Sequence, residues 1–158
     1  SGDIENGIEL VTSESADRVA ALLLQYPTLH RVQRADAALA AVVTELPEAR
    51  RFDAQRIADM YDFYLGDSGA PVAGELLPEQ LAELPPVVIV NADADELRAS
   101  GEEFAEQVRA AGVPVTDAIQ PGTVHGYMNR PEESDRARAD AQATIEFFVV
   151  ELRRILSV

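Results

Sequence analysis

The sequence predicts an α/β fold built on parallel strands, and the stretch 85–129 contains the observations that predict it. Two short apolar runs, 86–91 and 113–119, have the length and composition of buried strands. They flank a run with helical periodicity, 101–111, in which apolar residues recur at three- and four-residue spacing. A strand, a helix and a strand in this order form a β-α-β unit, whose two strands run parallel.

Ionisable side chains follow both of these strands. Asp93 and Asp95 come after the first strand, and His125 comes after the second. Because parallel strands end at one edge of the sheet and neighbours lie about 4.8 Å apart, we expect an aspartate and His125 to reach hydrogen-bond distance. A carboxylate that orients an imidazole is part of the Ser-His-Asp arrangement of nucleophilic catalysis. The residues alone leave both aspartates as candidates for this role.

Composition restricts the possible classes of function. The 158 residues, 47% of them hydrophobic, are predicted to form one domain, 1–158. A net charge of −15 argues against nucleic acid and anionic membranes as partners, because phosphate binding needs a basic surface. The chain has neither lysine nor cysteine, which excludes a P-loop, a Schiff-base enzyme, disulfides and thiolate metal sites. With no long apolar run and no leader pattern, we expect a cytoplasmic protein without a membrane span. The spacing of the two histidines and the nearby aspartate matches no metal-ligand motif, so we expect no metal, and we expect no cofactor.

A further strand is predicted upstream of the β-α-β unit. The nearly continuous apolar run 19–25 has the pattern of a strand buried on both faces, and Pro27 follows it. Residues 1–18 show no decisive pattern. Residues 66–85 are rich in glycine, proline and acidic residues, which is typical of a connecting loop, with one helical turn expected near 78–84.

Four helices are expected from apolar periodicity and end signals. The second, 54–65, has Asp53 at the N-cap position, with Phe52 and Ile57 placed as a hydrophobic staple. Ser100 with Glu103 fits a capping box for 101–111, and Asn129 with Glu132 fits the start of the last helix. The expected apolar faces are Leu39, Val42, Val43 and Leu46 in 35–46; Ile57, Met60, Tyr61 and Tyr64; Phe104, Val108 and Ala111; and Ile145, Phe148, Val149, Leu152 and Leu156. Tyr61 and Tyr64 either pack on the sheet or line a substrate pocket.

Two motifs at the predicted sheet edge resemble those of a known family. The run Asp95-Glu96-Leu97-Arg98-Ala99 is similar to Asp-Pro-Leu-Arg-Asp, and residues 121–127, Pro-Gly-Thr-Val-His-Gly-Tyr, are similar to Pro-Gly-x-x-His-Gly-Phe. Both patterns belong to the hormone-sensitive-lipase-like bacterial carboxylesterases, which have the α/β-hydrolase fold. Tyr26-Pro27 also resembles the Tyr-Pro pair of that family. The resemblance covers about 19–156 and is to the C-terminal half of such an enzyme.

This resemblance implies a partial α/β-hydrolase fold of about three parallel strands with helices on both faces. It also implies a serine carboxylic-ester hydrolase acting on a small-molecule ester, in which Asp95, rather than Asp93, orients the general base His125. The segment 28–84 would be a lid or connecting helical segment. Two departures from the family stand out: Glu96 replaces a proline, and the Gly-x-Ser-x-Gly nucleophile motif is absent. The nucleophile would then come from a complementary N-terminal half, or from Ser1.

The residues are also compatible with other interpretations. The chain is alternatively a non-catalytic module whose exposed edge strand, 19–25, pairs with another chain and forms an oligomer. His30 either faces the same cleft as His125 or is an ordinary loop residue. The spacing Asp93-x-Asp95 also resembles the paired aspartates of phosphatases, although their lysine is missing here. Ser13 and Ser15 lie in a polar stretch without the glycines of a nucleophile turn.

Overall fold

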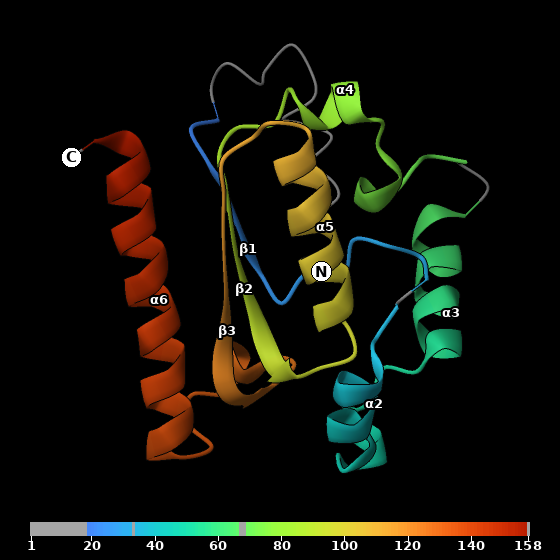
Figure 1. The fold of residues 1–158 in the computed structure, drawn as a ribbon. Coiled ribbons are helices and arrows are strands. Elements are labelled where there is room, and N and C mark those ends of the chain that lie inside the picture. Colours follow the sequence, from blue (N-terminus) through green and yellow to red (C-terminus); the bar gives the residue numbers. More distant parts are fainter. Residues whose placement is uncertain (1–18, 33, 67–68, 158) are drawn as a thin grey trace.

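The computed structural model describes residues 19–32, 34–66 and 69–157, which contain a three-stranded parallel sheet (Figure 1). The strands are β1 (Leu22–Gln25), β2 (Val87–Ala94) and β3 (Val115–Val124), in the order β1-β2-β3. Val87 aligns with Leu22 on one side and with Val115 on the other. The predicted parallel α/β arrangement is therefore confirmed, and all three strands end at the same edge of the sheet.

Helices cover both faces of the sheet (Figure 1). Helix α5 (Arg98–Ala110) connects β2 to β3 on one face, and α6 (Asp135–Leu156) follows β3 on the other. Between β1 and β2 lie α2 (Ala37–Thr44), α3 (Ala54–Leu65) and α4 (Pro78–Leu81), with the short 3-10 turns η2 (Glu48–Arg50) and η3 (Ala73–Glu75). A third such turn, η4 (Tyr127–Asn129), joins β3 to α6. The lid role of 28–84 stays a prediction.

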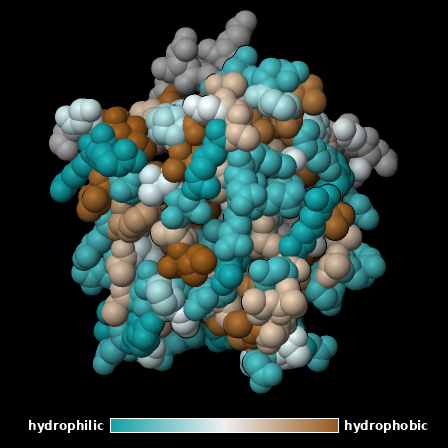
Figure 2. Space-filling view, in the orientation of Figure 1, coloured by the Kyte–Doolittle hydropathy of each residue, from teal (hydrophilic) through white to brown (hydrophobic). Residues whose placement is uncertain are grey.

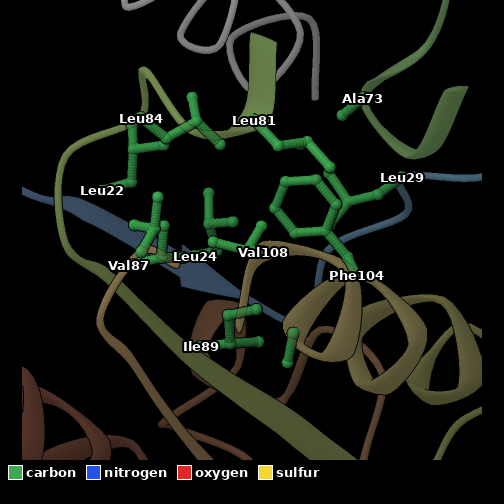
Figure 3. Close-up of a cluster of buried hydrophobic side chains, with 12 residues drawn as sticks. Leu22, Leu24, Leu29, Ala73, Leu81, Leu84, Val87, Ile89, Phe104 and Val108 are labelled. Atoms are coloured by element: carbon green, nitrogen blue, oxygen red, sulfur yellow. The ribbon is translucent and has the colours of Figure 1, made fainter. Parts of the chain in front are cut away.

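The main core lies between β1, β2 and α5 (Figure 3). Val87 and Ile89 point from β2 towards Phe104 and Val108 of α5, and all four are fully buried. Leucines from β1, the following loop and α4 close the cluster. Each fully buried side chain of this kind stabilises the fold by about 1.5–3 kcal/mol, so this face of the sheet anchors the β2-α5 turn.

Strand β1 is less enclosed than its sequence suggests. Leu22 and Leu24 are buried, whereas Leu23 is 40% exposed, so the prediction of burial on both faces is wrong. The reason is position: β1 is an edge of the described sheet, and its two leucines that face α5 are the ones that find partners. Ile119 of β3, at the opposite edge, is exposed as well.

Helix α6 turns a different face to the sheet from the one predicted. Its buried residues are Asp140, Ala141 and Thr144, while Ile145 and Val149 of the predicted stripe are exposed. Hydrogen bonds set this rotation, because the Thr144 hydroxyl pairs with that of Tyr127 and Asp140 accepts from the Gln120 amide. Val42 of α2 is likewise exposed rather than buried.

Of the helix N-caps predicted from the sequence, one is confirmed and two are wrong. Asp53 accepts from the Arg56 N–H at 2.8 Å and Phe52 packs beside Ile57, as predicted for the start of α3. The expected cap of the last helix, Asn129, lies in η4, and Ser134 caps α6 instead. Ser100 does not cap α5, which begins at Arg98, two residues earlier than Ser100.

Ser100 instead joins the loop after β1 to α5. Its Oγ accepts from the N–H groups of Leu29 (2.8 Å) and His30 (3.1 Å), and it lies 2.8 Å from Nδ1 of the His30 ring. With its lone pairs used in this way, the hydroxyl proton is left to donate to Nδ1, so the ring proton sits on Nε2. Nε2 then donates to Oε1 of Gln107 at 3.3 Å. We call these residues, with Gly74 packed against the His30 ring, the His30 cluster.

The face of the molecule drawn in Figure 2 is predominantly hydrophilic, in keeping with a net charge of −15, and apolar residues appear on it in separate patches. No helix within the described ranges is both long and apolar enough to cross a membrane.

Candidate active site at the carboxyl edge of the sheet

The ends of β2 and β3 bring a carboxylate and an imidazole together. Nδ1 of His125 lies 2.8 Å from Oδ2 of Asp95, across 30 residues of sequence. The Asp95 side chain is fully enclosed, at 0% exposure, whereas that of His125 is 25% exposed. One member of the pair is therefore buried and held, while the other reaches the surface, where a substrate can approach it.

The other oxygen of Asp95 is used by the turn that follows it. Oδ1 accepts from the Leu97 N–H at 3.0 Å, and the carbonyl of Asp95 accepts from the Arg98 N–H at 3.0 Å. These bonds close the tight turn between β2 and α5 and point the carboxylate along the sheet edge. Since each carboxylate oxygen has its own donor, Asp95 has little freedom to rotate away from His125.

Asp93 has a different role from Asp95. Its carboxylate accepts from the Gly122 N–H at 2.8 Å and from Arg98 at 3.2 Å, and its N–H lies 3.3 Å from the Thr123 hydroxyl. These contacts hold the last part of β3, which leads into His125. The structure thus places Asp95 on the imidazole and uses Asp93 to hold the strand that carries it.

The backbone on both sides of His125 is fixed as well. Gly126 has φ of +73°, a left-handed conformation that favours glycine, and this bend begins η4 directly after the histidine. The Arg130 guanidinium donates to the carbonyl of His125 at 2.8 Å. The imidazole is consequently presented from a short, well-anchored turn.

A pocket of about 270 Å³ opens beside the imidazole. Its lining residues are Arg50, Phe52, His125, Gly126, Asn129 and Arg130. Within the described ranges, Nε2 of His125 has no hydrogen-bond partner. A neutral ring that donates from Nδ1 to Asp95 has an acceptor lone pair at Nε2, so this nitrogen is available to take a proton.

Two aromatic rings that the sequence did not assign to the site contact the imidazole. Tyr26, at the end of β1, has its ring centroid 4.8 Å from that of His125, and Phe52, ahead of α3, has its centroid at 4.7 Å. The Tyr26-Pro27 pair was a visible signal for the first. No sequence signal marked Phe52 beyond its staple position, because its approach to His125 depends on how 28–84 folds back.

His30 does not line the pocket beside His125 and lies in the loop after β1, where it is not exposed. It is buried within the His30 cluster, bonded to Ser100 and Gln107. Of the two residues suggested for a substrate wall, Tyr61 is buried beside Ile57 and Val72, and Tyr64 is exposed. Ser1, Ser13 and Ser15 lie outside the described residues. No group of potential metal ligands occurs in the part of the chain that the structure describes.

Two tyrosines are buried at this edge, and their burial makes the free energy of unfolding depend on pH in the alkaline range. Desolvation raises the pKa of Tyr26 and of Tyr127 above 10.0, although Arg130 opposes the shift at Tyr26 and the Thr144 hydrogen bond opposes it at Tyr127. The unfolded chain ionises near pH 10, so this stability is complete below pH 10 and is lost as the pH rises through the raised values.

We therefore expect the free energy of unfolding in urea to fall above pH 10, and tyrosinate absorbance to show Tyr26 and Tyr127 ionising late. Tyr26→Phe is the control, because it removes one of these groups and should reduce the alkaline loss. A flat stability profile between pH 9 and 12 would contradict the expectation.

Comparison with known proteins assigns the chain to a family. The family model described as the alpha/beta hydrolase fold matches residues 7–129, most of the chain. The chain belongs to the α/β-hydrolase fold family. Esterase LipI of Mycobacterium tuberculosis is 36% identical over 91 residues, which are 54% of this chain and 28% of LipI.

Solved structures agree on the fold of this α/β-hydrolase chain. A fungal esterase from Rhizomucor miehei matches with a TM-score of 0.70 and 23% identity, covering 95% of this chain and 47% of its own. Brefeldin A esterase, described as a bacterial homologue of human hormone-sensitive lipase, matches with a TM-score of 0.62 and 22% identity, covering 96% of this chain and 42% of its own. The chain thus spans less than half the length of both of these esterase structures.

Proposed function

We propose that this chain supplies the histidine and aspartate of a serine carboxylic-ester hydrolase. The observation that carries the proposal is the 2.8 Å contact between a partly exposed imidazole and a fully enclosed carboxylate at the carboxyl edge of the sheet. Kinship with esterases adds support, since LipI and the matching structures bear that description. The substrate class is a small-molecule ester.

In the proposed mechanism, Nε2 of His125 takes the proton of a serine hydroxyl as that oxygen attacks the ester carbonyl. The proton then passes to the leaving alcohol, and the acyl-enzyme is hydrolysed by water activated in the same way. Asp95 keeps the Nδ1 proton in place and stabilises the imidazolium that forms. Burial of Asp95 strengthens this interaction, because little water is present to screen it.

The serine and the oxyanion donors are assigned to polypeptide outside the described residues. Ser100 is committed to the His30 cluster and Ser134 to the N-cap of α6, so neither is placed to act as the nucleophile. A complementary N-terminal half carrying Gly-x-Ser-x-Gly would supply both the nucleophile and the donors that stabilise the tetrahedral intermediate.

The direct test is hydrolysis of p-nitrophenyl acetate by this chain, alone and together with a polypeptide that carries the nucleophile motif. We expect turnover only in the combined sample, with a fluorophosphonate probe labelling the added serine. His125→Gln should abolish both signals while the fold persists. A folded chain that gives no turnover and no labelling in either sample would remove the enzymatic proposal.

A second candidate function rests on the exposed edge of β1. Strand β1 pairs with β2 on one side only within the described sheet, and Leu23 is 40% exposed there. An apolar strand edge of this kind accepts a further strand. The chain would then act as a non-catalytic module that pairs with a copy of itself. Sedimentation that finds a monomer at high concentration argues against this candidate.

A further inference from the structure

The imidazole of His125 lies between two aromatic rings that come from distant parts of the chain. The Tyr26 ring meets it at a centroid distance of 4.8 Å and an interplanar angle of 65°, and the Phe52 ring meets it at 4.7 Å and 62°. Both are edge-to-face contacts, an arrangement that aromatic pairs prefer. The ring is therefore contacted by one aromatic from the end of β1 and one from the segment before α3.

Tyr26 occupies its place in spite of two unfavourable features. Its φ of +35° is in the left-handed region, which side chains other than glycine seldom adopt. Its hydroxyl is buried and has no hydrogen-bond partner within the described ranges. What its ring gains is contact with His125, Tyr127 and Ala92. The side chain thus contributes to the site through its ring rather than through its hydroxyl.

Phe52 is held by the residue that follows Asp95. Its N–H donates to Oε2 of Glu96 at 2.7 Å, and the Arg56 guanidinium lies over its ring at 5.3 Å. Glu96 is the position at which this chain departs from the proline of the family motif. The turn that follows β2 therefore positions two neighbours of the imidazole. Asp95 contacts the ring directly, and Glu96 holds Phe52, which contacts it in turn.

We propose that Tyr26 and Phe52 are positioning residues that clamp the imidazole of His125, with Glu96 anchoring Phe52. The bond to Asp95 fixes one ring nitrogen, but the torsion about Cβ–Cγ of a histidine is broad by itself. Two rings on the imidazole restrict that torsion, so that Nδ1 stays on Asp95 while Nε2 stays on the pocket. The inference rests on the proposed function only where it says that catalysis uses this ring orientation. The orientation itself can be measured without catalysis.

The chain is well suited to a spectroscopic test because it has only two histidines. Their hydrogen-bond partners imply opposite ring protonation, with the proton on Nδ1 in His125 and on Nε2 in His30. Nuclear magnetic resonance of the ¹⁵N-histidine-labelled chain therefore separates the two N–H signals. The exchange of each with water reports how firmly its ring is held, and His30 serves as an internal control on folding.

We expect Tyr26→Leu and Phe52→Leu each to raise exchange of the His125 Nδ1–H at least tenfold, with the His30 signal unchanged. Tyr26→Phe keeps the ring and is the matched control, so its exchange should stay within twofold of the parent. Glu96→Ala should raise exchange less than Phe52→Leu, and Glu96→Gln, which keeps an acceptor oxygen, should have almost no effect.

Unchanged exchange at His125 in both leucine variants would overturn the clamp, whatever the esterase assay shows. If Tyr26→Leu loses the His30 signal, that variant has unfolded, and Phe52→Leu alone then decides. Because the readout needs no nucleophile, failure of ester hydrolysis leaves this test unaffected.

Discussion

Asp95→Asn is expected to lower kcat for p-nitrophenyl acetate by about 10⁴-fold in an active enzyme assembled from this chain and the polypeptide that supplies the serine. The reason is the bond from the Leu97 N–H to Oδ1 of Asp95. An asparagine satisfies that donor with its carbonyl oxygen, so its NH₂ group faces Nδ1 of His125. Nδ1 then has to accept, the ring proton moves to Nε2, and the lone pair that takes the serine proton is lost.

Asp93→Asn is the matched control for this substitution. It changes a carboxylate two residues away that contacts Gly122 and Arg98 rather than the imidazole. We expect kcat to change by less than about fivefold, because an amide oxygen still accepts from Gly122. A loss below tenfold for Asp95→Asn, or equal losses for the two variants, would contradict the role proposed for Asp95.

Gly74→Ala is expected to reduce the free energy of unfolding by about 3 kcal/mol. A Cβ at this position would lie 2.1 Å from Cδ2 and 2.2 Å from Nε2 of the His30 ring. That ring has no easy movement, because Ser100 holds Nδ1 and Gln107 pairs with Nε2. The Gln107 amide also donates to the Gly74 carbonyl at 3.2 Å, so the glycine backbone is held in place from the other side.

Two comparisons isolate the steric part of this effect in urea unfolding. Gly112 has φ of +86° with open space around it, so Gly112→Ala measures backbone strain without a clash and should cost about 1 kcal/mol. In a His30→Ala background, Gly74→Ala should lose most of its cost, giving a coupling of about 2 kcal/mol. Equal effects of the two glycine substitutions in the parent chain would show that the His30 cluster is not tightly packed.

The sheet edge was predictable because it depends on topology more than on packing. Two apolar strands around one helix are expected to run parallel, and parallel strands end together, so an aspartate after the first strand was expected to lie near His125 after the second. Local signals also succeeded where one residue acts on its own backbone, as Asp53 does at the start of α3. The expected caps at Ser100 and Asn129 were wrong. Ser100 instead accepts a hydrogen bond from the distant Leu29 N–H, and Asn129 lies in the short turn η4 before the last helix.

By itself, the amino-acid sequence determined the α/β class, the parallel strands and the ionisable residues, Asp93, Asp95 and His125, that gather at the carboxyl edge. These features follow from hydrophobic periodicity, which is a local property of the chain, and from the parallel topology that a strand-helix-strand order implies. The resemblance to the family selected Asp95 over Asp93, and in the structure Asp95 contacts the imidazole while Asp93 holds β3. Only the tertiary structure decided that His30 is buried on Ser100 and that Tyr26 and Phe52 meet at His125. Each of these contacts joins residues from separate segments, and their distance depends on how whole elements pack rather than on any spacing in the sequence.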